Sequence, residues 1–198
     1  MPRPRRISYP GAIYHIYNRG VNKQPIVHDI YDRKMFFSFL SESIKVYNLK
    51  LFAFCLMDNH YHLFLQTIET NLSKAMWQMS LGFSKFINNR YNRIGPLFQG
   101  RYQARIVQKE SYGKVLLSYI HNNPLEAKIT KSPEKYPWSS YGSYIGNFPQ
   151  WNYLDINGGL LFFDENPGKA LKDFKNFHLN TPSKHQLKKL KNMRYPLF

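Results

Sequence analysis

Two apolar runs separated by two polar residues place the strongest constraint on how this chain can fold. Residues 49–57 have the sequence LKLFAFCLM, and residues 60–66 have the sequence HYHLFLQ. The intervening Asp58 and Asn59 have side chains that favour tight turns. Two strand-like runs joined by two such residues are typical of a β-hairpin. The sequence therefore predicts two antiparallel strands over this part of the chain.

Further elements are expected on either side of the hairpin. Residues 12–18 and 98–107 have the composition of strands. Apolar residues recur every three or four positions in three other segments, which predicts helices. Their expected N-caps are Asp29 or Asp32, Asn71 and Ser111. The third helix is expected to stop at Asn123-Pro124. This order of elements predicts an α+β fold, an antiparallel sheet with helices packed on one face.

The charge of the chain indicates its class of partner. The 198 residues include 28 Lys and Arg against 12 Asp and Glu, a formal net charge of +16. Such an excess favours a polyanion, above all nucleic acid. A single cysteine, Cys55, excludes a disulfide scaffold and a cysteine-based zinc finger. No apolar run approaches the ~20 residues of a membrane helix, and no signal-peptide core follows the basic start. A cytoplasmic protein without membrane contact is expected.

His60 and His62 are the first candidates for a chemical role. Residues two apart in a strand project from the same face, so both imidazoles are expected on one side of the predicted hairpin. Two neighbouring imidazoles can share one divalent cation. The alternative is a pair of exposed or hydrogen-bonded histidines on a solvated strand.

Tyr119 and Asn123 of the third predicted helix are the next candidates. They lie four positions apart and so share a face of the helix. A tyrosine phenolate can attack phosphorus, and an amide oxygen can complete a metal shell. The alternative is that Tyr119 continues the apolar stripe of Tyr112 and Val115, and that Asn123 is an ordinary helix-end residue.

Four motifs in order resemble one protein family. The strings MDNHYHLFLQ, GPLFQGRYQARIV, SYIHNNPLEA and YPWSSY resemble the single-tyrosine HUH transposases, and within them the REP-associated tyrosine transposases. The resemblance covers roughly residues 5–146. It gives a domain over 1–146 with a basic N-terminal arm, and a C-terminal extension over 147–198 with a basic tail. Asp58 stands where the family often has proline, which adds a carboxylate near the expected metal.

The resemblance implies a fold, a site and a reaction. The fold is a ferredoxin-like sheet with His60 and His62 on a central strand as metal ligands. Asn123 matches the third ligand, Tyr119 matches the nucleophile, and the metal is Mg²⁺ or Mn²⁺. The substrate is single-stranded DNA, often marked by a hairpin. Cleavage gives a 5′-phosphotyrosine and a free 3′-OH, which can be rejoined without ATP. The protein acts as a monomer or a homodimer.

Basic residues are predicted to bind the DNA. Some belong to the N-terminal arm, some to loops, and Arg101 and Arg105 share one face of the last predicted strand. The predicted set is Arg3, Arg5, Arg6, Arg19, Arg90, Arg93, Arg101 and Arg105. Trp138, Tyr141 and Tyr144 are expected to pack against the core rather than stack on bases. His28 and His178 are expected at the surface.

Three other functions are compatible with parts of this pattern. A descendant of such a transposase can retain hairpin binding without cutting DNA. A zinc hydrolase can use the histidine pair with a third protein ligand and an open position for water. An RNA-binding protein fits the charge and the aromatic residues alone.

Overall fold

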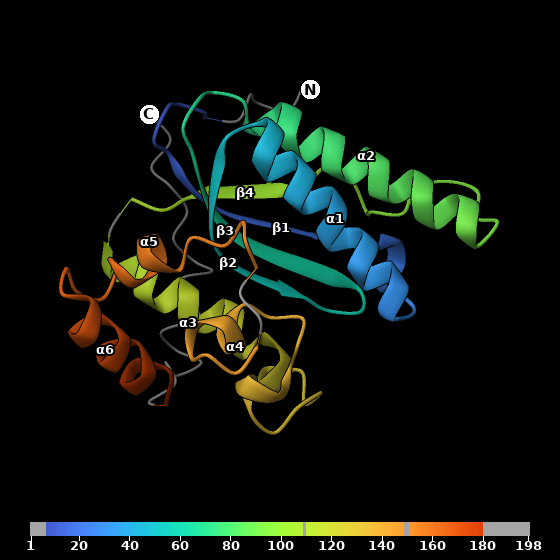
Figure 1. Ribbon diagram of the computed structural model, residues 1–198. Coiled ribbons are helices and arrows are strands. Elements are labelled where there is room, and N and C mark those ends of the chain that lie inside the picture. The colour runs from blue at the N-terminus through green and yellow to red at the C-terminus, as the bar shows by residue number, and fades with distance from the viewer. Residues whose placement is uncertain (1–6, 109, 149–150, 180–198) are drawn as a thin grey trace.

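The computed structural model describes residues 7–108, 110–148 and 151–179. Within them, four strands form one antiparallel sheet in the order β2-β3-β1-β4 (Figure 1). The strands are β1 (Ile13–Arg19), β2 (Leu49–Leu56), β3 (His60–Thr67) and β4 (Gln103–Ile106). The chain order strand, helix, strand, strand, helix, strand is the ferredoxin-like arrangement. The predicted α+β fold class and the β2–β3 hairpin are confirmed.

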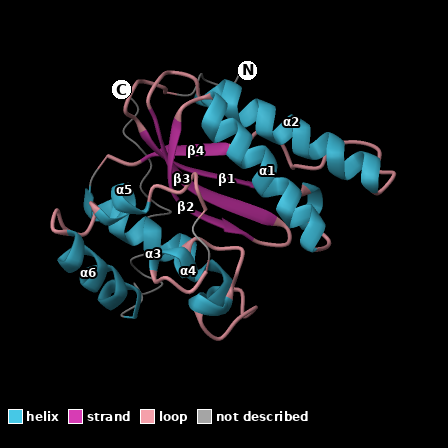
Figure 2. Cartoon of the chain, in the orientation of Figure 1, coloured by secondary structure: helices cyan, strands magenta, loops and turns pink. Residues whose placement is uncertain are grey.

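Helices cover both faces of the sheet, as Figure 2 shows. On one face lie α1 (Ile30–Val46) and α2 (Leu72–Arg90). On the other lie α3 (Glu110–Glu126), α4 (Tyr141–Tyr144), α5 (Ile156–Leu160) and α6 (Pro167–Leu179). Two short 3-10 helices, η1 (Val21–Lys23) and η2 (Pro133–Lys135), complete the described elements. The expectation of helices on one face holds for α1 and α2 and is wrong for α3.

The strands explain why two helical layers are needed. In β3, Tyr61, Leu63 and Leu65 belong to the core under α1 and α2. In β2, Phe54 belongs to that same core, whereas the adjacent Cys55 belongs to the core under α3. An uninterrupted apolar run is the pattern of a strand buried on both faces. The LFAFCL segment of β2 therefore requires a layer on each side.

The second core contains two buried histidines. His121 of α3 and His178 of α6 are 0% and 4% exposed, with His121 Nδ1 lying 3.0 Å from His178 Nε2. His121 Nε2 lies 2.8 Å from Ser140 Oγ, and His178 Nδ1 lies 2.8 Å from the Phe174 carbonyl oxygen. The expected surface position of His178 is wrong. Ala170, Phe174 and His178 follow one another at four-residue spacing, so they form the buried face of α6.

The aromatic segment after α3 packs as expected. Tyr141 and Tyr144 are 6% and 4% exposed, and Trp138 is partly buried against both cores. The Tyr144 hydroxyl donates to the Phe52 carbonyl oxygen of β2 at 2.6 Å. These rings therefore fasten the segment to the sheet.

Two element boundaries differ from expectation. β4 covers only residues 103–106. The preceding segment is held by an isolated bridge between Gly20 and Phe98 and by Asn18 Nδ2, which donates to the Gly100 carbonyl oxygen at 3.1 Å. α3 continues through Pro124 to Glu126. A proline so close to the helix end removes a single N–H donor, and the Ala127 N–H still donates to the Asn123 carbonyl oxygen at 3.0 Å.

Residues 151–179 are part of the folded body rather than a separate appendage. The Asp155 N–H donates to the Leu51 carbonyl oxygen of β2 at 2.8 Å. Leu160 and Phe174 are buried in the second core. The division at residue 146 stays a prediction, and the expected basic arm and tail lie outside the described residues. Among the described helices, none combines the length and the apolar character that crossing a bilayer requires.

Candidate active site

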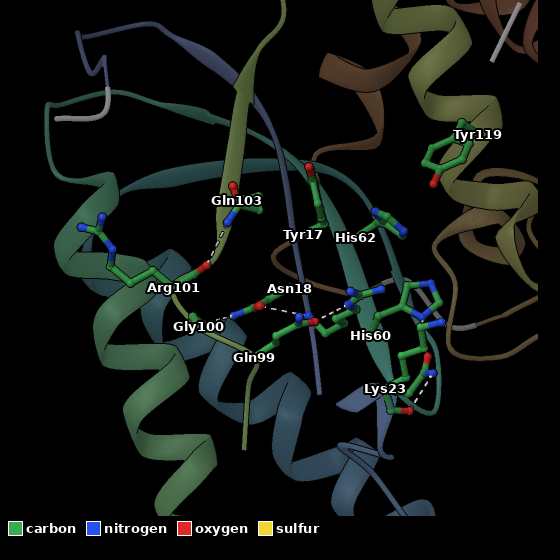
Figure 3. A pocket seen from close by; sticks show the side chains of 12 residues that line it. Tyr17, Asn18, Lys23, His60, His62, Gln99, Gly100, Arg101, Gln103 and Tyr119 are labelled. Atoms are coloured by element: carbon green, nitrogen blue, oxygen red, sulfur yellow. Dashed lines mark hydrogen bonds between the residues drawn. The ribbon is translucent and has the colours of Figure 1, made fainter. Parts of the chain in front are cut away.

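A cleft opens over the sheet face that carries α3. In the register of β1 and β3, Tyr17 pairs with His62 and Arg19 pairs with His60. Paired residues of antiparallel strands lie on the same face. The cleft has a volume of about 640 Å³, and His60, His62 and Tyr119 all line it (Figure 3). The structure therefore brings the candidate metal ligands and the candidate nucleophile together from β3 and α3.

Both ring nitrogens of His60 face an amide oxygen. Its Nδ1 lies 2.6 Å from Asn59 Oδ1, and the Asn59 Nδ2 donates to the Lys23 carbonyl oxygen at 3.1 Å. That second contact orients the Asn59 amide with its oxygen toward His60, so His60 Nδ1 donates. His60 Nε2 then carries the lone pair, and it lies 3.2 Å from Asn123 Oδ1.

His60 stays neutral over a wider pH range than an ordinary histidine. Burial lowers its pKa, and the positive charge of Arg19 acts in the same direction. The contact with Asn123 and the charge of Asp58 oppose that shift. A neutral imidazole is the form that can ligate a metal.

His62 lies deeper in the sheet and is 6% exposed. Its Nδ1 lies 3.0 Å from Nε2 of His15 in β1. The ring centroid of Tyr119 lies 5.3 Å from that of His62, with the two rings at 75°. His62 therefore contacts both a second histidine and the candidate nucleophile.

Tyr119 lies on α3 one turn before Asn123. The Asn123 Nδ2 donates to the Tyr119 carbonyl oxygen at 3.4 Å, a contact that orients the amide. Burial raises the pKa of the Tyr119 phenol, and the side chain of Asn123 partly offsets the shift. Tyr119 is thus a neutral phenol near pH 7, and ionisation requires nearby positive charge.

The donor set fits a divalent cation. His60 Nε2 and Asn123 Oδ1 both present lone pairs and lie 3.2 Å apart, a separation typical of neighbouring ligands on one ion with bonds of ~2.1 Å. The described residues contain no group of three His, Cys, Asp or Glu that could hold a metal. A shell here therefore needs an amide oxygen such as that of Asn123, or oxygens of the substrate.

Asp58 does not supply a further ligand. Its carboxylate is 62% exposed and pairs with the guanidinium of Arg33. Arg33 also donates to the Leu56 carbonyl oxygen at 3.2 Å and lies against the Trp138 ring. This ion pair directs Asp58 toward α1 rather than into the cleft lining, but its charge still acts on His60, so a carboxylate near the metal stays a prediction.

The predicted DNA-binding arginines are distributed unevenly. Arg19, at the end of β1, and Arg101 line the cleft, together with Lys23. Arg105 of β4 lies with its Cζ 5.8 Å from the centroid of the Tyr17 ring. Three cations therefore line the same cleft as the candidate catalytic residues. Arg3, Arg5 and Arg6 lie outside the described residues.

Arg90 and Arg93 lie away from the cleft lining. Arg90 is the last residue of α2, so its expected position in a loop is wrong. Its guanidinium pairs with Asp29 at 2.6 Å and with the buried Asp32 at 2.5 Å. Arg93 lies in the following loop, 3.5 Å from Gln24 Oε1. Binding of DNA by either residue stays a prediction.

Sequence reasoning missed several residues around the cleft. Tyr17 and Gln103 line it, and His15 contacts His62. The alternation of β1 is the signal that could have found His15 and Tyr17, because it places both on one face with Arg19. That face can be assigned to the site only once the pairing of β1 with β3 is known.

Comparisons with known proteins agree with this fold. Among solved structures, the chain resembles that of a REP-associated tyrosine transposase bound to a REP hairpin, with a TM-score of 0.64 and 15% identity. The match covers 79% of this chain and 93% of that chain. At this identity the likeness shows a shared fold. A protein from Deinococcus radiodurans assigned as a transposase matches with a TM-score of 0.42, 17% identity, and coverage of 62% and 97%.

The family itself follows from the sequence match. No curated protein matches the chain. A family model described as "Transposase IS200 like" matches residues 8–123, which is more than half of the chain. That range includes the whole sheet, α1 and α2, and it ends at Asn123. The chain belongs to the family of IS200-like transposases.

Proposed function

We propose that the protein is a metal-dependent single-strand DNA transposase that cuts and rejoins DNA through a covalent 5′-phosphotyrosine. The observation that carries the proposal is a cleft lined by Tyr119, His60 and His62, with Asn123 in contact with His60. Arg19, Lys23 and Arg101 line the same cleft. A hairpin DNA of the REP type is the proposed ligand, because the similar solved structure holds such a hairpin. We therefore propose that the protein belongs to the REP-associated branch of the family.

His60, His62 and Asn123 are the residues that would hold Mg²⁺ or Mn²⁺. When bound, such a cation neutralises the charge of the scissile phosphate and polarises a non-bridging oxygen. Because two of the three donors are imidazoles, Mn²⁺ should be accepted at least as readily as Mg²⁺. Arg19 and Arg101 would bind the phosphates on either side of the scissile phosphate.

Tyr119 carries the covalent step. Its Oη loses a proton and forms a bond to phosphorus, while the bond from phosphorus to the 3′ oxygen breaks. The departing oxygen takes up a proton and becomes a 3′-OH, and the 5′ phosphate stays on Tyr119. Attack by a 3′-OH on that phosphotyrosine reverses the step and joins two DNA ends. The ester bond is conserved throughout, so no ATP is needed.

Trapping the covalent adduct tests the proposal. The protein is incubated with Mn²⁺ and 3′-labelled single strands that cover the DNA flanking its gene. We expect label on the protein after heat and detergent, and none in Tyr119→Phe. That variant removes only the hydroxyl and keeps the ring against His62, so its melting temperature should stay close to that of the wild type.

Tyr112→Phe is the matched control. Tyr112 lies two turns earlier on α3 and is also partly buried against the second core, and its variant should form the adduct normally. An adduct on another tyrosine in Tyr119→Phe would contradict the assignment of the nucleophile. Cleaved DNA with a free 5′ phosphate and no adduct would indicate a metal nuclease that uses water. Hairpin binding without any cleavage would indicate a DNA-binding descendant.

A further inference from the structure

Both cleft histidines are held at Nδ1 by a neighbouring side chain. For His60 the neighbour is Asn59, whose Oδ1 accepts at 2.6 Å. For His62 the neighbour is His15, whose Nε2 lies 3.0 Å from His62 Nδ1. The two contacts occupy the same ring position, so each histidine has Nε2 as its remaining nitrogen.

His15 is a buried polar group that lies among aromatic rings and beside Arg105. It is 7% exposed and lies in β1 opposite Phe64 of β3 and Arg105 of β4. Its ring is nearly parallel to that of His62, with centroids 5.2 Å apart and an angle of 27°. It also meets the Tyr119 ring edge-on, with centroids 6.0 Å apart. One buried side chain on the cleft face of the sheet therefore touches both a candidate ligand and the candidate nucleophile.

The proton between the two histidines can belong to either ring. Two neutral imidazoles with facing nitrogens share one hydrogen bond, in which one ring donates and the other accepts. If His15 donates, His62 has its own proton on Nε2, and that nitrogen cannot bind a metal. If His62 donates, its Nε2 carries the lone pair. Only the second arrangement is compatible with His62 as a ligand.

We propose that His15 is a positioning residue of the metal site, whose Nε2 accepts a hydrogen bond from the Nδ1–H of His62. The proposal rests on the metal site of the proposed function and adds the group that sets its tautomer. Metal-ligating histidines commonly donate their other N–H to such a partner, which fixes the ring and strengthens the ligand. Asn59 does for His60 what His15 does for His62.

The wild-type protein provides the first test, without any metal. In protein with ¹⁵N-labelled histidine, long-range proton–nitrogen spectra distinguish a protonated ring nitrogen from one with a lone pair. We expect His62 to hold its proton on Nδ1, with His60→Ala and His62→Ala used to assign the signals. A proton on Nε2 of His62 overturns the proposal. This measurement needs no variant of His15 to fold.

Two substitutions at residue 15 provide the second test. His15→Phe keeps a flat ring and removes the acceptor, whereas the Oε1 of His15→Gln can accept at the position of Nε2. Mn²⁺ affinity, measured by calorimetry, should fall about 10- to 100-fold in His15→Phe and be largely retained in His15→Gln. His28→Phe, which removes an exposed histidine, is the control for adventitious binding and should match the wild type.

The outcomes separate this proposal from the one on which it depends. Equal loss in His15→Phe and His15→Gln, or no loss in either, overturns the role of His15 as an acceptor. A wild-type protein that binds no Mn²⁺ overturns the metal site itself. The His62 tautomer distinguishes the two failures, since it is measured without metal.

Discussion

At the scale of single residues, the candidate site is built from contacts set within one element and from contacts set by the pairing of strands. Alternation along a strand is enough to place His60 and His62 on one face, and helical spacing is enough to pair Tyr119 with Asn123. The contact between His15 and His62 is different. It is a diagonal contact that follows from the register His15–Phe64. Register depends on the whole hairpin and sheet, so the sequence of β1 alone did not indicate this contact.

Loss of either cleft histidine should abolish DNA cleavage and leave DNA binding largely unchanged. In His60→Ala or His62→Ala we expect cleavage to be lost. Loss of a residue that only hydrogen-bonds to a metal ligand typically lowers metal affinity about 10- to 100-fold, and loss of the ligand itself should lower Mn²⁺ affinity by more than that. Affinity for hairpin DNA, measured by fluorescence anisotropy, should change little, because phosphate contacts of Arg and Lys supply it. Wild-type cleavage by the double variant would place the metal site elsewhere.

At the scale of elements, α3 shows that a helix can be located in the sequence while the residues it packs against cannot be predicted. Its apolar stripe was visible in the sequence, but the stripe does not tell which sheet face it covers. Leu116, Leu117 and Ile120 pack on the α3 face of the sheet, against residues that come from the far C-terminal part of the chain. Phe174 and His178 are among them, and no local pattern connects them to Tyr119.

A chain of hydrogen bonds joins α3 to α6 and to Ser140, the residue before α4. The Ser140 hydroxyl lies against His121 Nε2, the His121 Nδ1 faces His178 Nε2, and the His178 Nδ1 donates to the Phe174 carbonyl oxygen. With both imidazoles neutral, every donor in this order has one acceptor. The pair therefore fastens α6 to the helix that carries the candidate nucleophile.

His178→Phe tests this connection through stability. The variant leaves the buried His121 Nδ1–H without its acceptor, which should cost about 1–3 kcal/mol in the free energy of unfolding at pH 7. Urea titrations followed by circular dichroism measure it. An unchanged midpoint would show that the histidine pair does not contribute to stability.

The same variant should change how stability depends on pH. Burial lowers the pKa of His178 to about 4, against ~6.5 in an unfolded chain. Between these two pKa values the unfolded state binds more protons than the folded state. The free energy of unfolding therefore decreases as the pH falls below 6.5, by up to ~1.4 kcal/mol per pH unit for one group. His178→Phe should lose less stability than the wild type between pH 7 and pH 5. An equal or larger loss would contradict the assignment.

At the scale of the whole molecule, net charge predicts the class of partner, whereas only the positions of the charged side chains tell which of them line the cleft. The formal charge of +16 predicts a nucleic acid partner from composition alone. It does not tell which cations face the ligand, since Arg90 is engaged by Asp29 and Asp32 while Arg19 and Arg101 line the cleft. Ion pairing of this kind depends on tertiary contacts between α1 and α2, which no sequence pattern reports.

Salt dependence of DNA binding tests which cations meet phosphates. For each phosphate that a side chain neutralises on single-stranded DNA, the slope of log affinity against log salt changes by ~0.7. We expect Arg101→Gln and Arg105→Gln each to reduce the slope by about that amount. Lys172→Gln, which removes one exposed charge from α6 outside the cleft lining, should leave the slope unchanged.

Equal reductions in all three variants would mean that the overall charge, rather than the cleft, binds the strand. Unchanged slopes in both arginine variants would assign Arg101 and Arg105 to a solvated surface, and the phosphates would then have to be bound by Arg19, Lys23 or the basic arm.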